Sequence, residues 1–417
     1  MLKVCVIGCG GIGGYHLSHL IQYTDLVELV GFCDLVLSRA EDFVRKAGSG
    51  KAYTNFTAML DEQNPDAVFI CIPPISHGEG CIELELVSRG IPFFVEKPVT
   101  LNLFIARRIR DAWECRRQLC DPDSCRLIYS ESDFLPGLVV DKYADVLVLQ
   151  SLSLGIERIK DMIADLLMEI VQPVGIWERS DVPVRRLEGM EQTTGLLRGE
   201  VPDLVEMKEN GILFGVDVKN GQKTGFFLDQ KENRAAIAPL CPGARVLDCF
   251  CHNGSFSLHA AKYGAKSVLG VDISEEALVV ARENAARNGF TNVTFEAHNC
   301  FDLLREYTEA GEQFDLVILD PPAFTKNKAA LQSALRGYKE INLRGLKLVR
   351  PGGYLVTCSC SQHVVTEMFQ NMVNEAARDA KKRIRLVEYR TQGKDHPLLP
   401  QSIETKYLKC MILQVME

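Results

Sequence analysis

The sequence predicts an α/β protein in which a doubly wound parallel sheet occurs twice, with a small α+β domain between the two copies. Near each end of the chain a short apolar strand runs into a glycine-containing turn and a helix, at residues 2–14 and 245–256, which is how such a sheet begins. Between them, alternating strands flank one amphipathic helix. At 417 residues the chain is too long for a single core, and two or three domains are expected.

The first strand, Leu2–Ile7, is followed by three glycines at the spacing of a dinucleotide-binding turn, and a helix is expected from Gly14 to about Tyr23. The second strand, Val27–Cys33, ends in Asp34, about 20 residues beyond the last glycine. Glycines let a pyrophosphate approach the backbone, and an acid at this distance binds the ribose hydroxyls. Asp34 would repel a 2′-phosphate, which favours NAD over NADP. The three glycines are Gly8, Gly10 and Gly13.

Residues 1–103 resemble the amino-terminal half of the glucose-fructose oxidoreductase and inositol dehydrogenase family. The resemblance is carried by the glycines, by Asp34, by the run at 67–74 and by the triplet Glu96-Lys97-Pro98. In that family the lysine of the triplet lies beside the nicotinamide, so the resemblance implies that Lys97 contacts NAD. We therefore predict an NAD-binding Rossmann domain at 1–103, although the substrate domain that follows it in the family is not recognisable here.

Residues 104–124 are predicted to form a linker helix, because apolar residues recur in it at helical spacing. The segment 125–219 is predicted to form the small α+β domain, with strands before and after one helix. The expected strands lie at 125–130, 138–140, 146–152, 175–178, 204–208 and 212–218, and the expected helix at 156–170.

The second glycine-containing turn belongs to the domain predicted at 220–417. Its strand ends in Asp248 and turns through Gly254 into a helix, and the next strand ends in Asp272, at the distance that suits ribose hydroxyls. The turn lacks a complete Gly-x-Gly-x-x-Gly and has a carboxylate where a pyrophosphate would lie. This argues for an adenosine ligand with a cationic group, such as S-adenosylmethionine (SAM). Asn299, after a third strand, is placed to contact the adenine amine.

Residues from about 104 to 417 resemble the bacterial family of large-subunit (23S) rRNA cytosine-5 methyltransferases. This resemblance implies a class I methyltransferase fold for the carboxyl-terminal domain and an rRNA partner. We expect the α+β domain to cradle the RNA, the alternative being that it only packs against the catalytic domain. The RNA-binding β-barrel that opens the family is missing. The matching motifs are 135–143, 221–230, Asp320-Pro-Pro-Ala-Phe324, 336–343, Thr357-Cys-Ser-Cys-Ser361 and Asp395-His-Pro397. In the family the second of these motifs lines the SAM site, which implies contacts from Gln222, Lys223, Thr224, Phe227, Asp229 and Gln230.

Carbon 5 of cytosine is not nucleophilic enough to accept a methyl group directly, so an enzyme first adds a nucleophile, usually a thiolate, to carbon 6. Cys358 matches the nucleophile position of the family and is favoured here. Cys360 is the alternative, because two residues further along a strand it would point the same way. Asp320 can hold N3 and the exocyclic amine while charge develops, and can also contact SAM. His396 is either near the site or a structural histidine.

Related Asp-Pro-Pro triplets occur in amine and adenine methyltransferases, but those enzymes do not need a downstream cysteine. The target cytosine must be single-stranded or flipped out of its stack. The formal net charge of −8 is unusual for an RNA-binding protein, but most of the acidic excess lies in the first domain. Two clusters of cations, within 107–117 and 378–385, either contact RNA or form solvated helix faces.

Fifteen cysteines without Cys-x-x-Cys pairs indicate reduced thiols, and no metal site is expected. No apolar run reaches the length of a membrane span, and the first residues do not resemble a secretory signal, so we expect a cytoplasmic protein without a membrane partner. The sequence leaves open whether the chain forms a homodimer. The competing interpretations are an NAD-dependent oxidoreductase with only its amino-terminal half present, and a reading frame that fuses two unrelated pieces.

Overall fold

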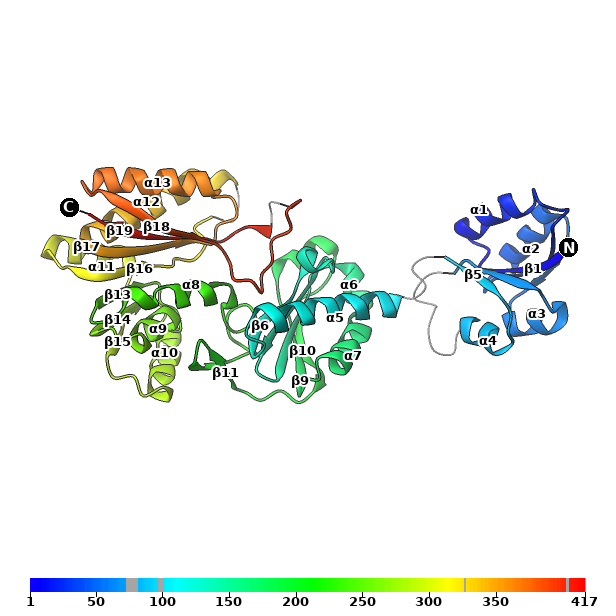
Figure 1. Cartoon of the computed structure of the whole chain (residues 1–417), viewed down its shortest axis with the longest axis horizontal. Helices are drawn as coiled ribbons and strands as arrows, with labels where there is room; N and C mark the ends of the chain where they lie inside the picture. Colours follow the sequence, from blue (N-terminus) through cyan, green and yellow to red (C-terminus); the bar gives the residue numbers. More distant parts are fainter. Residues whose placement is uncertain (73–81, 97–100, 326–327, 403–404, 417) are drawn as a thin grey trace. The chain divides into compact units, whose positions relative to one another are not determined.

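The computed structural model describes residues 1–72, 82–96, 101–325, 328–402 and 405–416. The chain divides into two compact units, Met1–Arg108 and Ile109–Glu417 (Figure 1). The finer division predicted at residues 103, 124 and 219 stays a prediction. Within the described ranges, no helix is both long and apolar enough to cross a membrane.

The first unit is a doubly wound Rossmann domain, which confirms the predicted fold class. Its five strands are arranged β3-β2-β1-β4-β5, and all are parallel. Helices α1 and α2 pack on one face through Leu17 and Phe43, and α3 and α4 pack on the other through Leu60 and Leu86. The elements are β1 (Leu2–Ile7), α1 (Gly11–Leu20), β2 (Val27–Cys33), α2 (Leu37–Ala47), β3 (Lys51–Tyr53), α3 (Phe56–Gln63), β4 (Ala67–Ile70), α4 (Ile82–Ser88) and β5 (Phe93–Val95).

The second unit contains most of α5 and a five-stranded mixed sheet in the order β10-β9-β8-β7-β6. Only β8 and β9 are parallel, because helices α6 and α7 make the crossover between them. The elements are α5 (Leu101–Leu119, which begins in the first unit), β6 (Ser124–Tyr129), β7 (Leu138–Tyr143), β8 (Val146–Ser151), α6 (Leu154–Arg158), α7 (Lys160–Ile170), β9 (Gly175–Ser180) and β10 (Thr193–Gly199).

Two details differ from the predicted α+β domain. The edge strand β10 was not predicted, because it is half exposed and contains two glycines, so it lacks a buried-strand pattern. Strands β11 (Val205–Glu209) and β12 (Ile212–Val216) form a separate hairpin instead of joining the sheet. Phe214 of this hairpin is buried with Tyr143 and Leu258, so the hairpin packs between the two sheets of the unit.

The carboxyl-terminal sheet has seven strands in the order β15-β14-β13-β16-β17-β19-β18, with only β19 antiparallel to its neighbours. Helices α11, α12 and α13 cover one face, and α9 packs on the other (Figure 1). This is the predicted Rossmann-like arrangement. The elements are α8 (Lys231–Ala236), β13 (Arg245–Cys249), α9 (Ser255–Lys262), β14 (Ser267–Asp272), α10 (Glu275–Arg287), β15 (Val293–Ala297), α11 (Cys300–Ala310), β16 (Phe314–Leu319), α12 (Leu331–Leu348), β17 (Val349–Ser359), α13 (Thr366–Asp379), β18 (Ile384–Arg390) and β19 (Lys409–Val415).

A buried ion pair within the mixed sheet is hydrogen-bonded to the loop that precedes α8. Asp141 of β7 is fully buried and accepts two hydrogen bonds from the Arg126 guanidinium, both at 2.8 Å. The hydroxyl of Thr224 donates to the same carboxylate at 2.6 Å. Arg116 of the first cation cluster is also buried, and it donates to Asp133 and to the carbonyl of Asp395, so it is not part of a solvated face.

We expect Asp141→Asn to destabilise the second unit by about 3–5 kcal/mol, because it leaves the Arg126 charge buried without its partner. Urea unfolding followed by tryptophan fluorescence measures this, since both tryptophans, Trp113 and Trp177, lie in the second unit. The matched control is Asp203→Asn, which removes a fully exposed partner of Lys219 and should leave the midpoint almost unchanged. Equal midpoints for the two variants would contradict the importance of the buried pair.

Candidate functional site

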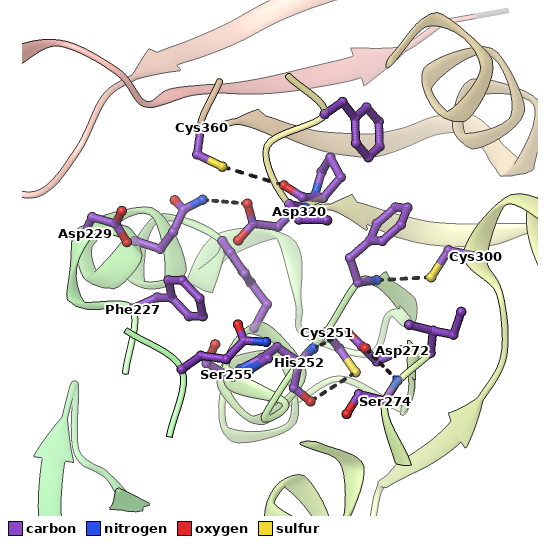
Figure 2. Close-up of a pocket in the computed structure, with 18 of the residues that line it drawn as sticks. Phe227, Asp229, Cys251, His252, Ser255, Asp272, Ser274, Cys300, Asp320 and Cys360 are labelled. Atoms are coloured by element: carbon purple, nitrogen blue, oxygen red, sulfur yellow. Dashed lines mark hydrogen bonds between the residues drawn. The ribbon is translucent and has the colours of Figure 1, made fainter. Parts of the chain in front are cut away.

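A cavity of about 460 Å³ opens at the carboxyl ends of β13, β14, β16 and β17. This is the edge at which ligands bind in open α/β sheets. Figure 2 shows Asp272, Ser274, Cys251 and His252 at one end of it, and Asp320 and Cys360 at the other. The predicted site residues that line it are Gln222, Lys223, Phe227, Asp229, Gln230, Asp272, Asn299, Asp320 and Cys360.

Three residues predicted to bind the cofactor lie behind the cavity wall. Thr224 bonds to Asp141 and to the hydroxyl of Tyr143, and so anchors its loop from behind. Asp248 is fully buried at the end of β13 and accepts a hydrogen bond of 2.6 Å from Ser257. Gly254 precedes α9 with a positive φ of 76°, and a Cβ there would lie 2.8 Å from the Phe295 ring, so only glycine fits.

The Asp272 end of the cavity is formed by two consecutive turns. The Asp272 carboxylate accepts hydrogen bonds from the backbone N–H groups of His252 at 2.9 Å and Ser274 at 3.0 Å. These bonds fix the side chain while leaving lone pairs for a ligand. The Asn299 side-chain oxygen caps α11 by accepting from the Phe301 N–H at 2.9 Å, so its amide group is left to donate.

Sequence reasoning missed the apolar lining of this end. Phe250, Ile273 and Phe301 all line the cavity, and Phe250 is brought there by a left-handed backbone conformation with φ of 64°. No sequence pattern predicts a left-handed backbone conformation for a phenylalanine. Ile273 could have been found from the sequence, because it is an apolar residue directly after a strand-end acid. In the structure its side chain is 75% exposed, so it has no role in the core.

The Asp320 end contains closely spaced carboxyl groups. Asp320 accepts a hydrogen bond of 2.8 Å from the Gln230 amide. Burial, reinforced by the negative charge of Asp229, raises the pKa of Asp320 to about 7. Burial acts on Asp229 in the same direction, but Lys223 and His396 oppose it and hold the pKa of Asp229 below its ordinary value. This end therefore holds one ionised carboxylate beside one that titrates near neutrality.

Asp229 also has an oxygen with no partner. Its Oδ2 accepts a hydrogen bond of 2.5 Å from the Tyr407 hydroxyl, whereas its Oδ1 is buried without a partner among the described residues. Oδ1 of Asp248 is likewise buried and unpartnered within the described ranges. Orphaned carboxylate oxygens beside a cavity indicate a cationic or hydrogen-bond-donating ligand. His396 does not line the cavity, and its Nδ1 lies 2.9 Å from Asp395 Oδ1.

The two candidate nucleophiles lie in different surroundings. Cys358 is fully buried within β17, directly opposite Cys410 of β19, in the core beneath α9. The strand ends at Ser359, so the alternation that would align the two thiols stops before Cys360. Cys360 lines the cavity with its Sγ 3.9 Å from the carbonyl of Pro321 (Figure 2). This geometry therefore does not support the preference for Cys358 as the nucleophile. The physical reason is that β17 ends between the two cysteines, so that only Cys360 reaches the cavity.

The glycine turn of the first unit brings its predicted residues together. Gly8 has φ of 92°, and a Cβ on Gly13 would lie 2.1 Å from the carbonyl oxygen of Gly8, whereas a Cβ on Gly10 would meet open space. Asp34 accepts hydrogen bonds from the backbone N–H groups of Cys9 and Val36, both at 2.9 Å. Helix α1 begins at Gly11 instead of Gly14, because a glycine within the motif can adopt helical angles. Lys97 lies outside the described residues.

Comparisons with known proteins find a match in each unit. A family model for a methyltransferase domain matches residues 240–402, and a model for the oxidoreductase family with an NAD-binding Rossmann fold matches residues 2–120. A protein of Aeromonas hydrophila called ribosomal RNA large subunit methyltransferase I is 45% identical over 337 residues, covering 79% of this chain and 85% of the relative. Its namesake in Shewanella denitrificans is 45% identical over 347 residues, covering 82% and 87%.

Solved structures agree on the fold. A protein of Streptococcus mutans described as a SAM-dependent methyltransferase superposes with a TM-score of 0.66 at 20% identity, covering 77% of this chain and 83% of that chain. A methyltransferase structure complexed with S-adenosylhomocysteine gives a TM-score of 0.67 at 21% identity, covering 76% and 83%. At these identities the likeness shows the fold alone.

We expect the stability of the second unit to fall between about pH 4 and pH 7 because of Asp248. Burial raises the pKa of this carboxyl to about 7, with further contributions from Asp320 and Asp272, while hydrogen bonding to Ser257 opposes the rise. The unfolded chain loses the proton near pH 4, so between these values the folded state binds more protons, and the free energy of unfolding falls by roughly 2–4 kcal/mol as pH rises.

Asp248→Asn should therefore flatten this pH dependence and gain stability relative to the parent at pH 8, as measured by urea unfolding at pH 5 and pH 8. Asp320 leaves a residual slope, because its pKa is raised to a similar value. The control is Asp302→Asn on the surface of α11, whose slope should match the parent. An unchanged slope in Asp248→Asn would show that this carboxyl is not held protonated.

Proposed function

This chain belongs to the family of ribosomal RNA large subunit methyltransferase I, and on that premise we propose that it methylates carbon 5 of a cytosine in large-subunit rRNA with SAM as methyl donor. One observation carries the proposal. A thiol and a titrating carboxyl group, Cys360 and Asp320, lie at one end of a cavity whose other end is closed by the strand-end acid Asp272. That order suits a cofactor with a nucleoside at one end and a reactive group at the other.

The residues of the cavity fit SAM. Asp272 is placed for the ribose hydroxyls, and Ile273 and Phe301 for the faces of adenine. The orphaned oxygen of Asp229, which lines the cavity, suits the ammonium or sulfonium charge, which a neutral or anionic ligand would lack. When bound, SAM supplies a methyl group that a carbon nucleophile can attack.

Cys360 and Asp320 act on the cytosine. The Cys360 sulfur forms a bond to carbon 6, and the electron pair of the ring double bond makes carbon 5 nucleophilic. Asp320 is positioned to hydrogen-bond N3, and with a pKa of about 7 its carboxyl group can deliver the proton that neutralises the ring as charge develops there. After carbon 5 has been methylated, a base takes its proton, the sulfur leaves carbon 6 as a thiolate, and N3 returns its proton to Asp320, which restores the neutral aromatic ring.

Addition of the Cys360 sulfur to carbon 6 requires access to the face of the base, which stacked neighbours cover in a duplex. The target cytosine therefore enters the cavity from a single strand or after flipping. An rRNA substrate fits the predicted cytoplasmic localisation.

We expect Cys360→Ala to lower methyl transfer to large-subunit rRNA by at least about a thousandfold, because the addition to carbon 6 is lost. Cys358→Ala should retain activity within about tenfold, since it removes a small buried side chain that does not reach the cavity. Transfer of labelled methyl from SAM measures both variants.

A covalent trap separates the two thiols directly. RNA containing 5-fluorocytidine cannot lose a proton from carbon 5, so the sulfur–carbon bond persists and the adduct survives denaturation. Peptide mapping of the adduct should identify Cys360. An adduct on Cys358 would exchange the two assignments, and methylation without any cysteine adduct would point to another position on the RNA.

We further propose that the first unit binds NAD. The supporting observation is its glycine turn with Asp34 at the end of β2, together with the family model matched there. A pyrophosphate needs the open space beside Gly10, and Asp34 is placed for the ribose. The second unit contributes the methyltransferase site, so NAD binding is a separate property of the chain.

We expect the full chain to enhance the fluorescence of NADH on binding, and Asp34→Asn to weaken that binding by about tenfold or more, because charge-assisted hydrogen bonds to the ribose are lost. The control is Asp42→Asn, an exposed carboxylate on α2 that should leave the affinity unchanged. No NADH binding by the parent would reject the proposal for the first unit and leave the methyltransferase proposal untouched.

A further inference from the structure

Lys409 is a buried lysine at the start of β19. Only 2% of it is exposed, and its Nζ donates hydrogen bonds of 2.7 Å to the carbonyls of Ser361 and Tyr407. Within the described ranges it has no carboxylate at ion-pairing distance and no third hydrogen-bond acceptor, so one of its three N–H groups is uncommitted. A buried ammonium held only by carbonyls is costly, and it requires a compensating role.

The position of Lys409 relates it to Cys360. Ser361, whose carbonyl it binds, is the residue directly after Cys360, and the neighbouring Leu408 lines the cavity. Lys409 itself is not part of the cavity lining. Lys223, the other cation near Cys360, does line the cavity and lies 4.6 Å from the Phe227 ring centre, where a bound ligand can engage it. Lys409 is held by main-chain carbonyls outside the cavity lining, one of them next to Cys360, so a ligand in the cavity does not need to displace its charge.

The groups that face Cys360 pull its ionisation in opposite directions. Burial, then Asp320 at the end of β16, raises its pKa to about 11, and Asp229 acts the same way, while Lys223 and Lys409 oppose them. On Lys409, burial lowers the pKa to about 8, Cys360 opposes this, and Lys406 adds to it. The ammonium is therefore mostly charged at pH 7, where a thiolate needs it.

We propose that Lys409 is a positioning residue that holds the main chain at Ser361 and places a positive charge behind Cys360 at neutral pH, which favours the thiolate form of the nucleophile. This inference rests on the proposed function, because that function makes the Cys360 thiolate the nucleophile. The effect of Lys409 on the thiol can be tested separately, because the reactivity of a thiol can be measured without RNA or SAM.

The test is the rate of Cys360 alkylation by iodoacetamide in the full chain at pH 7.5, resolved by peptide mass spectrometry. Below its pKa the rate follows the thiolate fraction, so a rise of one pKa unit lowers the rate about tenfold. Lys409→Gln keeps a donor for the carbonyls but removes the charge, and it should lower the rate about tenfold. Lys409→Arg should remain within about threefold of the parent.

Two controls accompany these variants. Lys406→Gln removes an exposed cation three residues away, which lies 5.7 Å from the Tyr389 ring centre, and it should change the rate by less than about twofold. Cys115, on α5, reports within the same samples that the chain is folded and the reagent active, and its rate should not change.

The parent chain offers a test that needs no folded variant. Asp320 faces Cys360 and ionises near pH 7, so it flattens the profile around that pH. Between about pH 8 and pH 9.5, where Asp320 is already ionised, the logarithm of the Cys360 rate should rise by clearly less than one per pH unit, because Lys409 loses its charge. A tenfold loss in Lys409→Gln with rescue by arginine supports the proposal. An unchanged rate in Lys409→Gln, or a slope of one between pH 8 and pH 9.5 in the parent, overturns it. Methylation by Cys360→Ala would instead reject the proposed nucleophile and leave the alkylation result standing.

Discussion

The burial of several carboxyl groups at one sheet edge is the constraint on which the methyltransferase unit depends. Asp229, Asp248 and Asp320 all lie at or just behind the same cavity, and two of them have pKa values raised to about 7. Like charges so close in a low-dielectric setting cannot all ionise freely. The protein offsets this with side-chain hydrogen bonds from Gln230, Ser257 and Tyr407, and two of the carboxylate oxygens have no partner among the described residues. A site built this way selects a cation.

The loop that carries Asp229 and Gln230 is held from behind by the mixed sheet. Thr224 of this loop bonds to Asp141, which in turn is fixed by Arg126. The backbone N–H of Arg126 also donates to Asp395 at 2.9 Å, which ties the loop before β19 into the same network. Every member is satisfied by another member, so the network specifies one arrangement of the two sheets. The mixed sheet thus contributes to the site through position and not through residues that line the cavity.

Most of the fold could be predicted from the sequence, because strand, turn, helix and strand-end acid follow one another at the spacing that a doubly wound sheet requires. Asp272 and Asp320 were found in the same way, since strand ends converge at one edge. The exposed edge strand β10 could not be found, because half-exposed residues and glycines leave no pattern. The contrast between Cys358 and Cys360 could not be predicted either, because it depends on where β17 stops pairing with β19. The sequence also gives no sign that Lys409 differs from an ordinary strand residue, because its hydrogen-bond partners are known only from the structure.

The two glycine turns of the chain show how one local structure serves opposite charges. In the first unit Gly10 precedes α1 beside open space, and the positive end of a helix dipole at such a place suits an anion. In the second unit the corresponding turn brings Phe250 and His252 into left-handed conformations and closes against the Phe295 ring, with Asp248 buried beneath it. A pyrophosphate there would meet a carboxyl group instead of an open helix end. The strand-end acids Asp34 and Asp272 are nevertheless held alike, each by two backbone N–H groups, because a ribose is the part that both proposed ligands share.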